Sequence, residues 1–442
     1  MKKKAVAVIL ALAAFALIAV GVVYTAQKHA LSETEFTHDG IVWTLKNGTA
    51  LVSGEGVLDD LAEQYDYARW QYGLLNLLEK ETPIKKVVLG EGITGVNDDA
   101  LRRLDGLKEI EVEEGNPYLS AADGVLYDQE KTVLLYYPPA KPGAAYTVPE
   151  GVTEIGCSAF AGNGTLKRIV FPEGLEAIGE NAFSDCGKLA ELTFPESLQR
   201  IGDRAFEGCA ALKALDLPDR LYAVGDQAFQ GCAGLTAVEL PAGLKKLGEC
   251  AFRHCAGVTA FTVAEGNTVF SAVDGVLFRY GGRVLVQYPR GKAGEVYAVP
   301  EGVEEIGYAA FEGSALTEAT FPDSLTRIGP AAFMDCAALE KVDMPDHVKA
   351  IDDAAFSGCA ALKEVTLAKY LESIGIEAFF GCPALKTVTV PKKVEFVGFR
   401  SLGFTALFGS KKYTEGFLLR CTEGSRAQAY AEEYGVSYEL VS

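Results

Sequence analysis

Cysteine and histidine are the residues of this 442-residue chain that could carry metal, redox or nucleophilic chemistry, and they number ten and four. Stacked positions in a repeat place side chains about 4.8 Å apart, wider than the roughly 3.8 Å between the Cβ atoms of a disulfide. One line of sulfurs cannot form a tetrahedral metal site either. We therefore expect buried thiols, in which Cys→Ser is worse than Cys→Ala because a hydroxyl needs a partner. This ladder comprises Cys186, Cys209, Cys232, Cys255, Cys336, Cys359 and Cys382, each three residues after a phenylalanine. The pairing of Cys157, Cys250 and Cys421, which lie outside the ladder, stays open.

The histidines and carboxylates do not form a recognisable catalytic group. His29 and His38 precede the repeats, and His254 and His347 occupy variable positions in separate units. The sequence contains no HExxH, GxSxG or GxxxxGK[ST] motif. One row of outward strand positions could hold a hard cation between its two carboxylates, although a solvated sheet face explains it better. That row is Thr193, Asp216, Glu239 and Thr262. The sequence thus predicts no enzyme, no cofactor and no metal site.

The elements that carry these residues follow a period of 23 residues. One unit reads Leu189-x-x-Leu192-x-Phe194-Pro195-x-x-Leu198-x-x-Ile201-Gly202-x-x-Ala205-Phe206-x-x-Cys209. The alternation of Leu192 and Phe194 predicts a short strand, which Pro195 ends. A fixed period of this length predicts a solenoid of stacked coils around one core. The phenylalanines expected to fill that core are Phe160, Phe183, Phe206, Phe229, Phe252, Phe311, Phe333, Phe356 and Phe379.

The solenoid is predicted to have about 13 coils with all strands in one parallel sheet. The strands should end near Leu89, Val112, Val148, Phe171, Phe194, Leu217, Leu240, Val263, Val299, Phe321, Met344, Leu367 and Val390.

The repeated run resembles the leucine-rich repeats of BspA-type bacterial surface proteins, whose pattern is LxxIGxxAFxxCxxLxxLxLP. It recurs in residues 175–186, 221–232 and 371–382, and the resemblance extends from about Ile84 to Leu402. The resemblance implies a parallel-strand horseshoe or gently curved rod, with turns and loops on its convex side. It also implies export to the cell surface and binding of host or neighbouring-cell molecules.

Two coils are enlarged by 13 residues each, at 113–148 and 264–299. Each contains the words Asp-Gly-Val-Leu and Tyr-Pro, and we predict a β-hairpin in each, with strands near 125–127 and 133–137 in the first copy. Insertions in repeat proteins often map to a binding face, although packing of the alternating aromatics onto their own coil explains the pattern better. The candidate partner-binding residues are Tyr118, Tyr127, Tyr136, Tyr137, Phe270, Phe278, Tyr280 and Tyr288.

Both ends of a solenoid need caps that cover the open core and strand edge. Segment 31–83 should form the first cap, with a hairpin across Asn47-Gly48 and a helix over Asp59 to Lys80. The solenoid occupies 84–408. Segment 409–442 should form the second cap, with a strand at 415–420, a helix capped by Ser425 that runs to about Tyr434, and a strand at 436–440.

Residues 1–30 are predicted to be a targeting segment. Lys2-Lys3-Lys4 precede an unbroken apolar run from Ala5 to Val23, longer than the usual 7–15 residues of a cleaved signal peptide. An uncleaved signal-anchor is therefore favoured over a cleaved signal, and the lysines place the repeats outside the cell. The expected location is the extracellular face of a bacterial membrane or the medium.

The formal net charge of −19 argues against nucleic acid or an anionic membrane surface as the partner. Two interpretations of function remain. The first is a surface protein that binds a protein or glycan on another cell or in the matrix. The second is a structural envelope spacer or assembly module without a dedicated ligand. A binder should cluster aromatic residues and arginine on its exposed rows, whereas a spacer should be uniformly polar.

Overall fold

The computed structural model describes residues 34–38, 40–58, 84–97, 100–405 and 413–441. The chain is a β-solenoid of about 15 turns with parallel sheets, which confirms the predicted fold class. It divides into two compact units, Met1–Pro142 and Gly143–Ser442, and the boundary lies inside the segment that the sequence assigns to one solenoid.

Unit 1 contains a five-stranded sheet in the order β1-β2-β3-β5-β7. The first three strands pair antiparallel, and β3, β5 and β7 pair in parallel. Asn47 and Gly48 join β2 to β3 with φ angles of 52° and 79°, as the hairpin signal predicts. The predicted helix over Asp59 to Lys80 and the targeting segment lie outside the described residues. The strands are β1 (Thr34–His38), β2 (Ile41–Lys46), β3 (Thr49–Ser53), β5 (Lys86–Leu89) and β7 (Glu109–Val112), with β4 (Gly56–Leu58) paired to β6 (Ile93–Val96).

Each enlarged coil forms an antiparallel meander of three strands. The predicted hairpins are present, but each has an additional first strand that the sequence analysis missed. That strand is hard to predict in unit 1, because Leu-Ser-Ala-Ala contains no β-branched or aromatic residue. The strands are β8 (Leu119–Ala122), β9 (Val125–Asp128) and β10 (Val133–Tyr136) in unit 1, and β20 (Phe270–Val273), β21 (Val276–Arg279) and β22 (Val284–Gln287) in unit 2.

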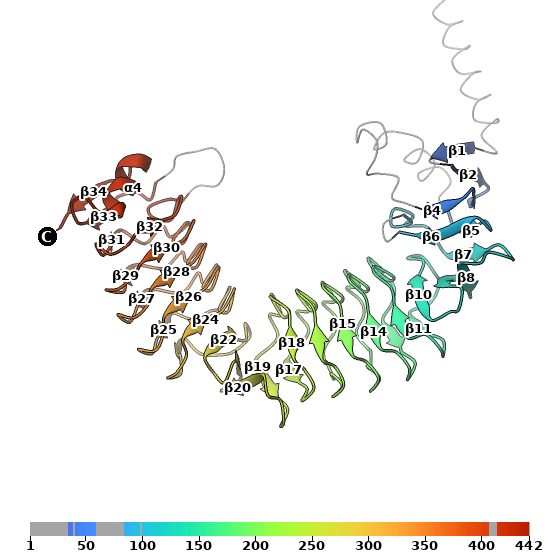
Figure 1. Cartoon of the computed structure of the whole chain (residues 1–442), viewed down its shortest axis with the longest axis horizontal. Coiled ribbons are helices and arrows are strands. Elements are labelled where there is room, and N and C mark those ends of the chain that lie inside the picture. Colours follow the sequence, from blue (N-terminus) through green and yellow to red (C-terminus); the bar gives the residue numbers. More distant parts are fainter. Residues whose placement is uncertain (1–33, 39, 59–83, 98–99, 406–412, 442) are drawn as a thin grey trace, which may run out of the picture. The chain divides into compact units, whose positions relative to one another are not determined.

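Unit 2 stacks its coils in chain order, and most coils contribute to two lines of short strands (Figure 1). We call the first the strand-A line. It lies where the alternating Leu-x-Phe pattern predicts strands, and those of its strands that pair with one another do so in parallel. It comprises β11 (Ala145–Thr147), β13 (Arg168–Val170), β17 (Ala237–Leu240), β19 (Ala260–Val263), β23 (Val296–Ala298), β25 (Glu318–Thr320), β27 (Lys341–Asp343), β29 (Glu364–Thr366), β31 (Thr387–Thr389), β33 (Leu418–Cys421) and β34 (Tyr438–Leu440).

The prediction of one continuous sheet is wrong, because the strand-A line is divided into several parallel sheets. No strand ends near Phe194 or Leu217, where only an isolated bridge joins Arg168 to Glu191. At the enlarged coil the meander takes over the hydrogen bonding. Phe261 in β19 donates its amide to the carbonyl oxygen of Gly275 at 2.8 Å, so β19 does not pair with β23.

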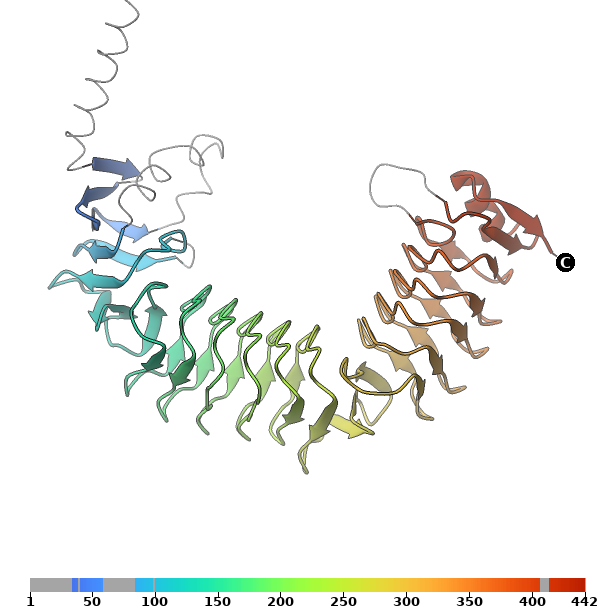
Figure 2. The same ribbon diagram turned by 180° about the vertical axis from the view of Figure 1, so that it is seen from behind.

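The second line, which we call the strand-B line, was not predicted. Its strands are two residues long, and each precedes the repeat glycine or its equivalent (Figure 2). A Cβ atom at Gly225 would lie 2.5 Å from the amide nitrogen of Asp203, so glycine allows successive coils to approach closely. The line comprises β12 (Glu154–Ile155), β14 (Ala177–Ile178), β15 (Arg200–Ile201), β16 (Ala223–Val224), β18 (Lys246–Leu247), β24 (Glu305–Ile306), β26 (Arg327–Ile328), β28 (Ala350–Ile351), β30 (Ser373–Ile374) and β32 (Phe396–Val397).

The core of unit 2 contains a stack of aromatic rings. The ring centroids of Phe183 and Phe206 are 5.1 Å apart, and those of Phe206 and Phe229 are 5.3 Å apart, with nearly parallel planes. All nine repeat phenylalanines are buried. In the second enlarged coil Tyr288 takes the stacking position, 5.1 Å from Phe311. A single coil buries too little apolar surface to fold alone, and stacking on neighbouring coils provides the missing burial.

The C-terminal segment contains the predicted helix, α4 (Arg426–Tyr434). Ser425 caps it by accepting a hydrogen bond from Gln428, and Gly435 ends it in the left-handed region with φ of 70°. Tyr430 is buried and exchanges hydrogen bonds with the main chain of Leu402. The strands on either side of the helix are β33 and β34, which pair in parallel.

Candidate functional site

The enlarged coils present only two of the eight aromatic residues proposed as contacts. Tyr118 and Tyr280 are 53 % and 56 % exposed. The other six are buried, which corrects their assignment as contact residues, because a buried ring packs the meander and cannot reach a partner. They are Tyr127, Tyr136, Tyr137, Phe270, Phe278 and Tyr288.

Lysines fasten both meanders in the same way. Lys292 donates to the carbonyl oxygen of Asp274 at 2.8 Å, and its ammonium lies 3.3 Å from the Asp274 carboxylate. Lys141 makes the same two contacts with Asp123 in unit 1. The repeated Asp-Gly sequences therefore have a structural role, because each aspartate holds its turn to a lysine.

The outward side of the strand-A line is mostly polar, with Val170 and Val296 as exposed apolar exceptions. Thr193, Asp216, Glu239 and Thr262 are all exposed, as the alternation predicts. Farther along, Lys341 and Asp343 form an ion pair of 2.6 Å, and Thr366 donates to Asp343 at 2.7 Å. Within the described ranges no three His, Cys, Asp or Glu side chains are grouped closely enough to hold a metal ion. This face has the composition expected of a solvated sheet.

The outward side of the strand-B line changes character along unit 2. Between Glu154 and Gly248 it is a shallow groove of about 510 Å³ whose floor includes the repeat glycines. Carboxylates line one side, and part of their role is structural. Asp203 accepts a hydrogen bond from the amide of Asp226 at 2.8 Å, and Asp226 accepts one from the amide of Glu249 at 2.7 Å.

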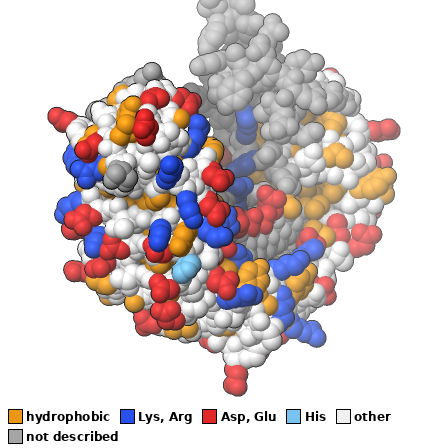
Figure 3. Space-filling model, turned by 60° about the vertical axis from the view of Figure 1, so that its left-hand side comes forward, with side chains coloured by type: hydrophobic (Ala, Val, Ile, Leu, Met, Phe, Trp, Pro, Cys, Tyr) orange, Lys and Arg blue, Asp and Glu red, His pale blue; other side chains and the backbone are white. Residues whose placement is uncertain are grey.

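In the last coils the same outward positions carry large apolar side chains. Ile376, Phe396 and Phe399 are 44 %, 48 % and 50 % exposed, and we call them the C-terminal aromatic patch. Ile376 and Phe399 occupy the repeat position that holds Asp203 and Asp226 in earlier coils. Figure 3 views this end of unit 2, where hydrophobic and basic side chains lie beside one another on the surface.

Neighbouring side chains hold Phe399 of the aromatic patch in place. The ring of Phe399 packs edge-on against Tyr434, with centroids 5.6 Å apart. The guanidinium of Arg400 lies 5.7 Å from the Phe399 ring and 4.4 Å from the Phe380 ring, and it pairs with Glu377 at 3.1 Å. An aromatic cluster beside a positioned arginine is the composition of interface hot spots. Sequence reasoning missed this patch, although the departure of two outward positions from the repeat pattern was a usable signal.

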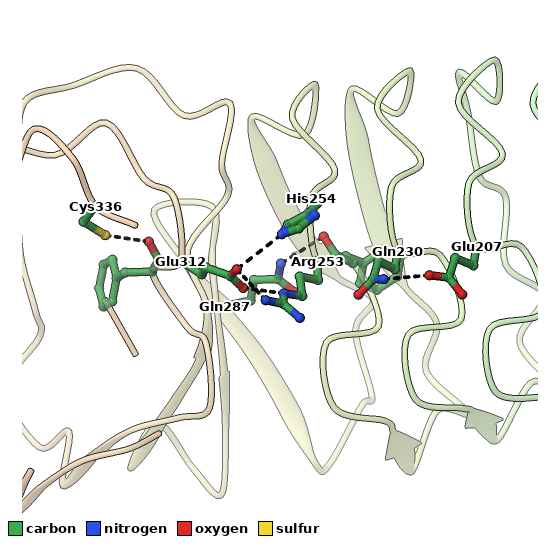
Figure 4. Close-up of polar contacts among 9 residues, drawn as sticks. Glu207, Gln230, Arg253, His254, Gln287, Glu312 and Cys336 are labelled. Carbon is green, nitrogen blue, oxygen red and sulfur yellow. Dashed lines mark hydrogen bonds and ion pairs between the residues drawn. The ribbon is translucent and has the colours of Figure 1, made fainter. Parts of the chain in front are cut away.

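A second polar network crosses the enlarged coil of unit 2 (Figure 4). Glu312, whose side chain is only 5 % exposed, accepts two hydrogen bonds from the Arg253 guanidinium at 2.5 and 2.6 Å. His254 lies 3.3 Å from the same carboxylate. The hydrogen bonds with Glu312 raise the pKa of Arg253. Arg253 and Glu312 are thus a link between coils 59 residues apart in sequence rather than a site open to ligand.

The fold and the repeat define a leucine-rich repeat solenoid. Residues 144–272 and 295–403, more than half of the chain, match the family described as BspA type Leucine rich repeat region, in six copies. The chain therefore belongs to the BspA-type leucine-rich repeat family of bacterial surface proteins.

Solved structures share the fold at low sequence identity. The pneumococcal vaccine antigen PcpA is 21 % identical with a TM-score of 0.59, over 92 % of this chain and 99 % of PcpA. A leucine rich cell surface protein from Faecalibacterium prausnitzii A2-165 is 22 % identical with a TM-score of 0.57, over 92 % of this chain and 99 % of its own. No curated protein matches the sequence significantly. Among the described residues, no helix is both long enough and apolar enough to span a membrane.

Proposed function

We propose that this chain is a non-catalytic binding protein of the bacterial cell surface that engages a partner protein through the C-terminal aromatic patch. The observation that carries the proposal is the exposure of Ile376, Phe396 and Phe399 at outward positions where most earlier coils carry polar or small residues, with Tyr308 as the one large aromatic exception. Exposed apolar clusters of this kind mark interaction sites in soluble proteins. Membership of a surface-protein family supports the location.

The aromatic patch suits a protein partner better than a small uncharged ligand. Its Phe399 side chain is anchored by Tyr434 and Arg400, so little conformational entropy is lost when this ring is covered. A few well-packed residues, aromatic ones and arginine prominent among them, supply most of the binding energy of typical protein interfaces. Polar residues of the strand-A face would not be needed for such a contact.

Cell binding by the full-length chain tests the proposal. Phe396→Ser/Phe399→Ser should weaken binding to target cells about tenfold or more, equivalent to about 1.4 kcal/mol. Tyr222→Ser, which changes an exposed aromatic residue in an earlier coil, should leave it unchanged. Protease treatment of the target cells should abolish binding, whereas periodate oxidation of their glycans should not.

A structural spacer is the second candidate, and the polar strand-A face favours it. Under that alternative the chain would be retained in the cell envelope without a dedicated ligand. Equal cell binding by the double variant and the unaltered chain would show that the aromatic patch is not the binding site. Absence of any saturable binding by the unaltered chain would favour the spacer.

A further inference from the structure

The turn between the two strand lines carries a distinctive group of side chains in the last coils. His347, Tyr370 and Lys393 occupy one repeat position at intervals of 23 residues, and Lys369 and Lys392 precede the last two. We call these five residues the turn patch, and all five are exposed. Parallel strands on either side hold successive coils about 4.8 Å apart, so the patch extends over about 10 Å.

The turn patch reverses the charge that the repeat has at this position. Lys369, after Ala368, and Lys392, after Pro391, stand where most earlier coils of unit 2 carry an acidic residue directly after proline, with Ala242 as an exception. The acidic residues are Glu150, Glu173, Glu196, Asp219, Glu301, Asp323 and Asp346. The next position is small in most of these coils, as at Gly174 and Ser197, but it holds a ring or an ammonium in the turn patch. A structural turn does not require this exchange.

Tyr370 lies at the centre of the turn patch between cationic groups. The ammonium of Lys393 is 4.5 Å from the centroid of its ring, and that of Lys369 is 5.4 Å away. The His347 ring is 6.3 Å away, between centroids. Both ammonium groups are within the range of a cation–π contact. The Tyr370 amide donates to the carbonyl oxygen of Asp346 at 3.3 Å, which fixes the turn.

The positive charges of the turn patch are not neutralised by ion pairs. Lysines elsewhere in these coils have partners, such as Lys349 with Glu372 at 3.6 Å and Lys363 with Glu340 at 3.1 Å. Within the described part of the chain, no carboxylate pairs with Lys369, Lys392 or Lys393. The acidic residues nearest in sequence are Asp346, Glu372 and Glu395.

We propose that the turn patch binds an acidic sugar of an anionic polysaccharide. The carboxylate or sulfate would lie between the ammonium groups of Lys369 and Lys393, and the pyranose ring would lie against Tyr370. The net charge of −19 does not prevent this, because charges farther than about 8 Å are largely screened at physiological ionic strength. The turn patch is one turn wide, which suits a linear polymer better than a planar membrane. This ligand is independent of the protein partner proposed for the aromatic patch.

Binding of the full-length chain to defined polysaccharides tests the inference. The probes are heparin, which carries sulfates, and polygalacturonate, which carries carboxylates, with neutral dextran for comparison. We expect saturable binding to at least one anionic polymer at low ionic strength, weakening as salt is added. Lys369→Gln/Lys393→Gln and Tyr370→Ala should each weaken it about tenfold or more, a loss of about 1.4 kcal/mol. Tyr370→Phe should retain it, because the ring remains.

Lys341→Gln/Lys363→Gln is the matched control, since it removes the same charge from the strand-A side of neighbouring coils. An equal loss in this control would show a general charge effect and overturn the site. Equal binding to dextran, no binding to either anionic polymer, or binding only to anionic phospholipid vesicles would also overturn it. Phe396→Ser/Phe399→Ser should bind the polysaccharide normally, so either proposal can fail without the other.

Discussion

The Cys209 thiol donates a hydrogen bond to the main-chain carbonyl oxygen of Phe183 in the preceding coil, at 3.2 Å. Every ladder cysteine makes this contact with the repeat phenylalanine 25 or 26 residues earlier, at 3.0–3.2 Å. All seven are free thiols. The ladder position is therefore a small buried donor that links coils, and not only a small hydrophobic group.

This contact reverses the expected order of two substitutions at Cys209. Cys209→Ser should be no more destabilising than Cys209→Ala, because the hydroxyl finds the Phe183 carbonyl as its acceptor. Ser314 already occupies the ladder position of one coil, 3.3 Å from the Cys336 sulfur. Urea unfolding of both variants measures the difference in free energy of unfolding. A Cys209→Ser variant less stable than Cys209→Ala by more than about 1 kcal/mol would show that the thiol contact contributes nothing.

Stability should fall at alkaline pH because of the ladder thiols. Burial raises the pKa of Cys186, Cys255 and Cys382 to about 12, against about 8.5 for an exposed thiol. The folded pKa is raised, so the contribution is complete below about pH 8.5 and is lost as the pH rises toward 12. Urea midpoints should decline above about pH 9. Replacing Cys186 and Cys255 with alanine should reduce the slope.

Alkylation at neutral pH is an independent test of the burial of the ladder cysteines. Iodoacetamide should modify the exposed Cys157 in the folded protein and the ladder cysteines only after unfolding. Cys157 is thus the internal control for reagent activity. Rapid modification of Cys209 without denaturant would contradict the rigid packing of the coils.

The sequence predicts the repeat, the strand-A positions, the buried phenylalanines and α4, because each has a local signature in spacing or capping. It does not reveal the strand-B line, since two residues such as Arg200 and Ile201 are too short to show alternation. It also cannot separate buried from exposed aromatics in the meanders, because Tyr127 and Tyr280 differ only in which side of a strand or turn they occupy. Nor does it single out Phe396 and Phe399, since the outward positions beside the strand-B line cannot be recognised until that line is known.

Phe206→Ala should destabilise the protein by about 3–5 kcal/mol, the usual cost of deleting a buried aromatic side chain. Its ring stacks on Phe183 and Phe229 at 5.1 and 5.3 Å, so both neighbouring coils lose a contact. Hydrogen exchange should therefore increase in the two adjacent coils. Tyr222→Ala, at an exposed position of a neighbouring coil, should change the free energy of unfolding by about 0.5 kcal/mol or less.

Glu312→Ala should cost about 1.5–3 kcal/mol, the range for hydrogen bonds to charged groups. The variant leaves Arg253 without the carboxylate that accepts two of its hydrogen bonds, on a side chain that is 22 % exposed. Glu207→Ala is the matched control on the same row, because Glu207 accepts one hydrogen bond from Gln230 at 2.7 Å and has only a long, exposed contact of 3.9 Å with Arg204. This variant should cost about 0.5–1.5 kcal/mol. The double variant Arg253→Met/Glu312→Leu replaces the ion pair by an apolar pair. It should be more stable than Glu312→Ala, since replacement of a buried ion pair by well-packed side chains is often neutral. Urea unfolding followed by tyrosine fluorescence measures all three. Equal costs for Glu312→Ala and Glu207→Ala would mean that the link across the enlarged coil contributes no more than an ordinary surface hydrogen bond.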